Sequence, residues 1–119
     1  MTKILAVDDS ASMRQMVTFT LSGAGYQVKD AADGKQALDI AKQEQFDVVV
    51  SDVNMPVMDG ITLIQELRKL PQYKSTPLLM LTTESSSDKK MAGKQAGATG
   101  WIVKPFNPDK LLKTIARVV

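Results

Sequence analysis

Acidic, hydroxyl and basic residues follow four of the apolar segments in this chain. Asp8 and Asp9 follow the first segment, Asp52 a later one, and Thr82 and Lys104 two more. In an open parallel sheet, ligands bind in the crevice beyond the carboxyl ends of the strands, where residues distant in sequence meet. Two like charges about 4 Å apart repel by ~4 kcal/mol at an effective dielectric constant near 20, and a divalent cation relieves that cost. The pattern therefore predicts a cation-binding site.

The residue types restrict which cation this is. The 119 residues include no histidine and no cysteine, which excludes imidazole and thiolate ligands, cysteine nucleophiles and disulfides. Carboxylates remain as ligands, and they favour a hard ion such as Mg²⁺. Taken singly, these acids have a structural alternative: Asp9 or Ser10 caps a first helix, and Asp52 begins a turn.

Short apolar runs alternate with helical patterns along the chain. The runs at 4–7, 48–50, 78–81 and 101–103 are typical of buried strands, and the alternating run at 27–31 is typical of an edge strand. Helical spacing of apolar residues lies between and after them, and the segment 88–96 has the weakest apolar face, so we expect its docking to be the least stable. This alternation predicts an α/β fold, a three-layer sandwich with an open parallel sheet, in one domain over residues 1–119.

The overall composition is that of a soluble globular protein, with 44% hydrophobic and 24% charged residues. No signal-peptide pattern and no apolar run of transmembrane length are present, so we expect a cytoplasmic protein without membrane contact. Residues 85–119 hold seven basic and two acidic residues, whereas residues 1–84 hold eight and eleven. The two regions are expected to meet different partners.

Four motifs together identify a resemblance. They are Val7-Asp8-Asp9-Ser10, the stretch 51–60 around Asp52 (SDVNMPVMDG), Thr82-Thr83-Glu84 and Lys104-Pro105-Phe106. With them the chain resembles the receiver domains of two-component signalling, in particular the CheY-like single-domain chemotaxis response regulators. The resemblance implies a doubly wound, flavodoxin-like, five-stranded parallel sheet. Its strand order 2-1-3-4-5, of which CheY is a standard example, is implied by the resemblance alone.

The resemblance also implies the roles of the acidic residues. Asp52 is then the phosphoacceptor, and Mg²⁺ is bound by Asp9, Asp52 and the backbone carbonyl of Asn54, with Asp8 assisting. Phosphoryl transfer depends on positioning and charge neutralisation, and a carboxylate serves as the nucleophile when a metal holds it beside the phosphoryl oxygens. Lys104 supplies a second positive charge; its structural alternative is a solvated lysine before a turn.

Three further residues have implied roles in switching and geometry. In receivers the Lys104–Pro105 bond is cis, which X-Pro sequences permit. Thr82 resembles the hydroxyl that moves to bind the phosphoryl group, and Trp101 stands where relatives carry a Tyr or Phe that turns inward. For Trp101 the alternative is core filling, and for Thr82 an ordinary strand-end threonine.

Basic residues predict a partner surface in the last third of the chain. It comprises Lys89, Lys90, Lys94, Trp101, Lys110, Lys113 and Arg117. An acidic or amphipathic partner segment fits this charge, and a merely solvated face is the alternative. The resemblance implies a CheA-like histidine kinase as phosphodonor and a flagellar motor switch protein as target. A phosphate sink without motor output would have the same sequence pattern. We expect a monomer, and because the basic residues form no recognition motif, we expect no direct nucleic-acid binding.

Rival functions lack their required residues. A flavin-binding flavodoxin-like domain needs a non-acidic, hydroxyl-rich loop after the first strand, where this chain has Asp8 and Asp9. A haloacid-dehalogenase phosphatase needs a DxD pattern, and position 10 is Ser; no GxxxxGK[ST] loop is present. A purely structural interaction module does not require all of these acids together with Lys104. We therefore expect no enzyme acting on a separate metabolite, but a receiver that catalyses only its own phosphorylation and dephosphorylation.

Overall fold

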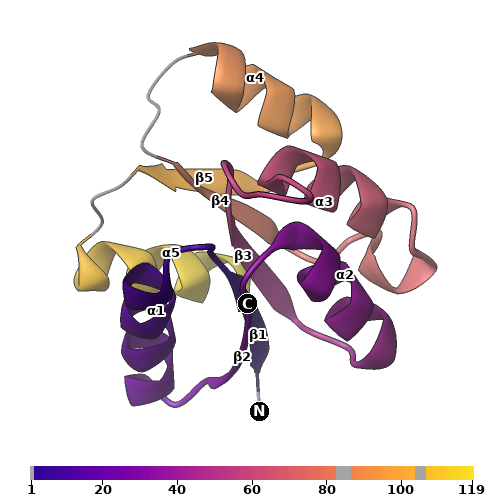
Figure 1. Cartoon of the computed structure of the whole chain (residues 1–119). Helices are drawn as coiled ribbons and strands as arrows, with labels where there is room; N and C mark the ends of the chain where they lie inside the picture. Colours follow the sequence, from indigo (N-terminus) through magenta and orange to yellow (C-terminus); the bar gives the residue numbers. More distant parts are fainter. Residues whose placement is uncertain (1, 83–86, 104–106) are drawn as a thin grey trace.

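The computed structural model describes residues 2–82, 87–103 and 107–119, and the side chains of all of these except 87–89. Strands and helices alternate along the chain (Figure 1). The strands are β1 (Lys3–Val7), β2 (Gln27–Ala31), β3 (Val48–Asp52), β4 (Leu78–Thr82) and β5 (Gly100–Val103). The helices are α1 (Ala11–Gly23), α2 (Gly34–Gln43), α3 (Gly60–Arg68), α4 (Ser87–Ala96) and α5 (Pro108–Val118), with a short 3₁₀ helix η1 (Pro71–Tyr73) that was not predicted.

The five strands form one parallel sheet in the order β2-β1-β3-β4-β5, which confirms the implied doubly wound, flavodoxin-like fold. The edge strand predicted at 27–31 is β2, with the same bounds. In the register, Val7 pairs with Ser51 and Asp52 pairs with Leu81. The carboxyl ends of β1, β3 and β4 therefore lie side by side along one edge of the sheet.

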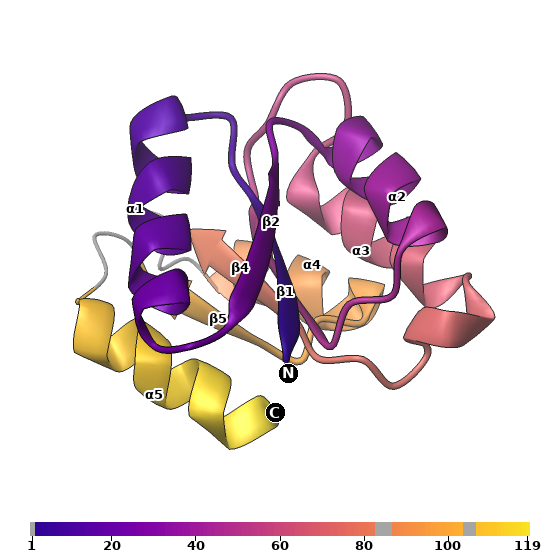
Figure 2. The same ribbon diagram turned by 90° about the horizontal axis from the view of Figure 1, so that it is seen from below.

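Helices cover both faces of the sheet. Helices α1 and α5 lie on one face, and α2, α3 and α4 lie on the other (Figures 1 and 2). Alternate strand residues enter the two cores: Ile4 and Ala6 pack with α1 and α5, whereas Leu5 and Val7 pack with α2 and α3. Because both faces of the inner strands are buried, their sequences are almost continuously apolar.

Side-chain caps begin four of the helices. Ser10 Oγ accepts from Met13 N at the start of α1, and Asp33, Asp59 and Asn107 cap α2, α3 and α5 through their side-chain oxygens. Such a cap contributes about 1 kcal/mol. Of the two caps considered for the first helix, Ser10 is the one used, which leaves Asp8 and Asp9 to the edge of the sheet.

Helix α4 approaches the sheet through small residues. A Cβ added at Gly93 would lie 2.7 Å from Met80 Cε, so the helix backbone passes directly over β4. Among its described side chains, Ala96 is buried and Met91 is exposed. This composition leaves α4 little apolar area to bury, and the weak docking expected for it stays a prediction.

Candidate metal centre and its surroundings

Three carboxylates converge at the carboxyl edge of the sheet. Asp8 and Asp9 follow β1, Asp52 ends β3, and one carboxylate oxygen from each lies within 4.8 Å of the others. Asp8 and Asp52 are buried, and Asp9 is exposed. Two oxygens that share one Mg²⁺ at about 2.1 Å lie no more than about 4.2 Å apart. Small side-chain rotations therefore suffice to bring these oxygens around one ion, so the donor set fits a hard divalent cation.

Backbone donors orient the two buried carboxylates. Ser10 N donates to Asp8 Oδ1 over 2.9 Å, and Val53 N donates to Asp52 Oδ1 over 2.9 Å. Each bond spans only one or two residues, so the turn after each strand sets the direction of its own carboxylate. The strand register then sets the distance between the two carboxylates.

Arg14 fixes the turn after β1, a role that the sequence analysis missed. Its Nη1 donates to the Asp8 carbonyl over 2.8 Å, and its Nε donates to Asp30 Oδ2 over 2.9 Å. Helical side chains lean toward the N-terminus of their helix. The position of Arg14 in the first turns of the helix after Asp8 and Asp9 was therefore the sequence signal that its side chain reaches back to the turn after β1.

The loop after Asp52 is packed against the end of β3. A Cβ at Gly60 would lie 2.0 Å from the Asp52 carbonyl oxygen, so only glycine allows this approach. Gly60 N also donates to the Val53 carbonyl over 2.8 Å. Asn54 lies in this loop and is exposed. The role of its carbonyl as a metal ligand stays a prediction.

Val57, at the middle of this loop, has a left-handed backbone. Its φ is +70°, and Met58 N donates to the Pro56 carbonyl over 2.8 Å across it, which forms a three-residue turn. With a positive φ at its central residue, this is the rare and strained type of γ-turn, and a β-branched residue with positive φ is an outlier. Nothing in the sequence signalled this conformation, because valine is not a turn residue.

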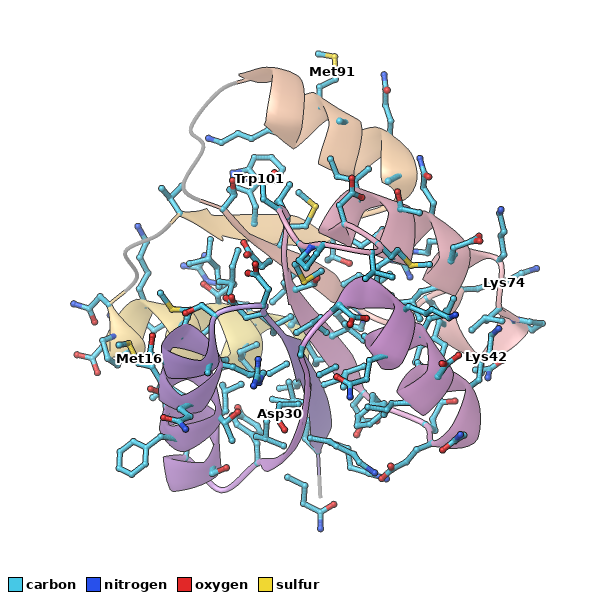
Figure 3. The ribbon with its side chains drawn as sticks, in the orientation of Figure 1. Met16, Asp30, Lys42, Lys74, Met91 and Trp101 are labelled. Atoms are coloured by element: carbon cyan, nitrogen blue, oxygen red, sulfur yellow. The ribbon has the colours of Figure 1, made fainter. Side chains whose placement is uncertain are left out.

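Thr82 and Trp101 occupy neighbouring strands. Thr82 ends β4 and is buried, one residue beyond Leu81, which pairs with Asp52. Trp101 is 37% exposed and lies on the side of the sheet covered by α4 (Figure 3). Lys90 Nζ lies 5.3 Å from the centroid of its ring. The core-filling alternative for Trp101 is therefore wrong: Trp101 is exposed, and the buried residue of β5 is Ile102, which faces the opposite side of the sheet.

The predicted partner surface is partly described. Lys94, Lys110, Lys113 and Arg117 are exposed, on α4 and α5, which lie on either side of the edge strand β5 (Figure 1). The side chain of Lys89 lies outside the described residues. So do Lys104 and Pro105, and with them the predicted ammonium and cis peptide bond. No helix within the described part of the chain has the length and apolar character needed to cross a membrane.

Residues 4–116 match the response regulator receiver domain, and the chain belongs to that family. It is a CheY-like receiver. The structure of chemotaxis protein CheY4 of Vibrio cholerae is similar over 100% of this chain and 99% of that one, with 60% identity and a TM-score of 0.97.

Two other similar proteins are a probable transcriptional regulator and a receiver domain of a histidine kinase. The probable transcriptional regulator ycf27 of Porphyridium aerugineum is 44% identical over 98% of this chain, which spans only 48% of that protein's length. The receiver domain of sensor histidine kinase PA1611 of Pseudomonas aeruginosa PAO1 has 28% identity and a TM-score of 0.92, over 98% of this chain and 96% of that one. That structure holds a magnesium ion coordinated in its active site cleft.

Proposed function

We propose that the chain is a phosphoacceptor response regulator in which Asp52 receives a phosphoryl group and thereby switches a protein-binding surface. The observation that carries this proposal is the convergence of Asp8, Asp9 and Asp52 within 4.8 Å at the carboxyl edge of the sheet. A histidine kinase is the phosphodonor, as expected for a receiver of two-component signalling.

The chemistry places Asp52 as the nucleophile. One of its carboxylate oxygens attacks the phosphorus of a phosphohistidine, the P–N bond breaks, and the leaving imidazole takes up a proton. Asp8, Asp9 and the carbonyl of Asn54 would hold Mg²⁺ beside it; when bound, this ion neutralises charge on the phosphoryl oxygens. The carboxylate cluster and the magnesium in the PA1611 receiver support this ion. Lys104 would supply the second positive charge, and the chain transforms no separate metabolite.

Switching follows from new contacts of the phosphoryl group. Thr82, buried beside the end of β3, donates its hydroxyl to the phosphoryl group, and Trp101 responds on the neighbouring strand. The altered surface of α4, β5 and α5 then presents Lys90, Lys94 and Lys113 among its basic residues to an acidic partner segment.

Chemotaxis is the first candidate for the pathway, because CheY4 is 60% identical to this chain. The target is then a motor switch protein, or there is none if the chain acts as a phosphate sink. A transcriptional output is the second candidate, favoured by the 44% identity to ycf27. For residues 1–119 themselves we propose one monomeric receiver domain that acts in the cytoplasm and contacts neither membrane nor nucleic acid.

The test is labelling by acetyl phosphate, followed by intact mass with and without Mg²⁺. We expect one phosphoryl group on the wild-type chain only when Mg²⁺ is present, and none on Asp52→Asn. Asp39→Asn, an exposed acid on α2, is the matched control and should label normally. Labelling that persists in Asp52→Asn would reassign the acceptor. Capture of candidate partners by labelled and unlabelled protein then tests the switch.

A further inference from the structure

We infer that Gly34, the first residue of α2, is a positioning residue for the metal site, because its contact with Met58 sets the path of the loop that carries Asn54. The inference rests on the proposed function, in which the Asn54 carbonyl is a ligand of Mg²⁺. It adds a supporting role for α2, a helix that contributes no residue to the site itself.

Gly34 is needed for a close approach and not for its own backbone. Its φ lies outside the left-handed region, so a residue with a Cβ could adopt the same conformation. Alanine is also the better helix former. A Cβ at this position, however, would lie 2.9 Å from Met58 Cβ and nearer still to the Met58 carbonyl oxygen. Because that oxygen belongs to the backbone, turning a side chain cannot relieve the overlap, and only glycine permits this approach.

Hydrogen bonds hold both sides of this contact. Gly34 N donates to the Met58 carbonyl over 3.2 Å. At the start of α2, Gln36 N donates to Asp33 Oδ1 over 2.8 Å, and Ala32 N donates to Gln36 Oε1 over 2.6 Å. These reciprocal bonds are similar to a capping box. They fix the first turn of α2 independently of the loop, so Gly34 is a firm support for Met58.

The loop after β3 has little freedom to absorb a shift of Met58. At its start, Val53 N donates to a carbonyl of β4 over 3.2 Å, and at its end, Gly60 N donates to the Val53 carbonyl over 2.8 Å. Both ends are thus tied to the sheet, so the residues just before Met58, Asn54 among them, would take up the displacement. Mg²⁺ demands near-ideal octahedral coordination. A displacement too small to unfold the loop would therefore weaken its binding.

The same contact should respond to the ion. If displacement of Met58 from Gly34 weakens Mg²⁺ binding by some factor, bound Mg²⁺ disfavours that displacement by the same factor. Amide exchange at Gly34 reports the opening of its hydrogen bond to Met58, so this exchange should slow when Mg²⁺ binds. The unaltered chain thus offers a test that needs no substitution.

Two substitutions in α2 separate positioning from stability. Gly34→Ala adds the methyl group for which Met58 leaves no room. Ala41→Gly, the control, removes a buried methyl group two turns further along α2 and so weakens the helix without adding an atom. NMR titrations measure the Mg²⁺ and Ca²⁺ dissociation constants of each protein, and thermal unfolding in EDTA measures its melting temperature. Amide exchange is measured in the wild type with and without saturating Mg²⁺.

We expect both variants to melt below the wild type, and only Gly34→Ala to bind Mg²⁺ more weakly, by about tenfold, the scale for a residue that orients a metal ligand. Ca²⁺ tolerates irregular coordination, so its affinity should fall less in Gly34→Ala. In the wild type, Mg²⁺ should slow exchange at Gly34 N by up to about tenfold. It should not change exchange at Glu44 N, which is bonded to the Ile40 carbonyl at the far end of α2.

An unchanged Mg²⁺ dissociation constant in Gly34→Ala, an equal loss of Mg²⁺ affinity in Ala41→Gly, equal losses for the two ions, or exchange at Gly34 that Mg²⁺ does not slow would each overturn the inference. If Gly34→Ala does not fold, the exchange measurement decides by itself. A wild-type chain that binds no Mg²⁺ would instead remove the proposed function, and the inference with it.

Discussion

The guanidinium of Arg68, at the end of α3, donates to the Gly97 carbonyl, at the end of α4, through Nη2 over 2.7 Å and Nε over 2.9 Å. Its Nη1 donates to the carbonyls of Tyr73 and Thr76, each over 2.7 Å, in the turn before β4. Burial lowers the pKa of Arg68 from its ordinary value, but an arginine stays protonated in proteins. One side chain therefore joins α3, the turn before β4 and the end of α4.

Replacement of Arg68 by methionine should destabilise the protein by about 1–3 kcal/mol, because methionine keeps the apolar stem but leaves partly buried carbonyls without their donor. Urea unfolding measures the loss, and hydrogen exchange should rise most in residues 97–100. Lys69→Met is the matched control: its ion pair with Glu66 is exposed, so its effect should stay under about 0.5 kcal/mol. Equal effects of the two substitutions would contradict the role of Arg68.

Gly60→Ala should destabilise the chain by about 3 kcal/mol or more, because its Cβ would lie 2.0 Å from the Asp52 carbonyl oxygen and the end of β3 would have to move. Mg²⁺ affinity, measured by calorimetry, should fall as well. Gly23→Ala is the control, since a Cβ there meets nothing within 4 Å. That helical substitution should be neutral or stabilise by up to about 1 kcal/mol. A Gly60→Ala protein with wild-type stability would show that the backbone at Gly60 does not lie tightly against the Asp52 carbonyl.

Asp9→Asn should have opposite effects with and without magnesium. In EDTA the variant should be more stable by about 1 kcal/mol, because one charge of the cluster is removed and Asp9 is exposed enough for screening to limit the gain. Mg²⁺ at about 100 times its dissociation constant should raise the free energy of unfolding of the wild type by about 2.7 kcal/mol, and its melting temperature should rise accordingly. The variant should lose most of that gain, and Asp39→Asn should keep it. A variant less stable than the wild type in EDTA would argue against repulsion among these acids.

Tyr73 should make the protein sensitive to alkali. Its buried hydroxyl donates to the carbonyls of Ala41 and Glu44, each over 2.8 Å, and burial raises its pKa above the ordinary value of 10.0. Because the folded state favours the neutral phenol, the contribution of Tyr73 to the free energy of unfolding is fully present below pH 10. It is lost as the pH rises through the raised pKa of the folded state.

Tyr73→Phe should therefore cost about 1–3 kcal/mol at pH 7 and flatten the fall of stability above pH 10. Urea unfolding across pH 7–11 measures both effects. Tyr26→Phe, on the other side of the sheet, is the comparison variant. If the stability of Tyr73→Phe falls as steeply above about pH 10 as that of the wild type, ionisation of Tyr73 is not the cause of the alkaline sensitivity.

Lys90 should shield Trp101 from solvent. A cation above an indole ring at an exposed site contributes about 0.5–1 kcal/mol. Trp101 is the only tryptophan, so its fluorescence reports this contact directly. Lys90→Ala should raise the acrylamide quenching constant and shift the emission to the red, whereas Lys94→Ala, also on α4, should do neither. Identical quenching in all three proteins would mean that the ammonium does not cover the ring in solution.

Much of the fold was predictable from local patterns. Apolar runs placed four of the strands to within two residues, because a strand buried on both faces leaves a continuous signature that needs no knowledge of its neighbours, and the alternating pattern at 27–31 placed the edge strand β2. The same runs located Asp8, Asp9 and Asp52 at strand ends, since the residues that follow a buried strand emerge at the edge of the sheet. The strand order was not predictable in this way and came from the family resemblance.

The tertiary structure decided the contacts that join distant segments. The bonds from Arg68 to Gly97 and from Tyr73 to Ala41 span 29 and 32 residues, and they depend on register and side-chain direction, which no local pattern records. The same holds for the backbone of Val57, which is imposed by the bonds that anchor its loop. Composition and spacing determined which groups reach the edge of the sheet, because burial is periodic along each element. Distances between those groups were decided only when the elements packed, because hydrogen bonds and steric contact act across the fold.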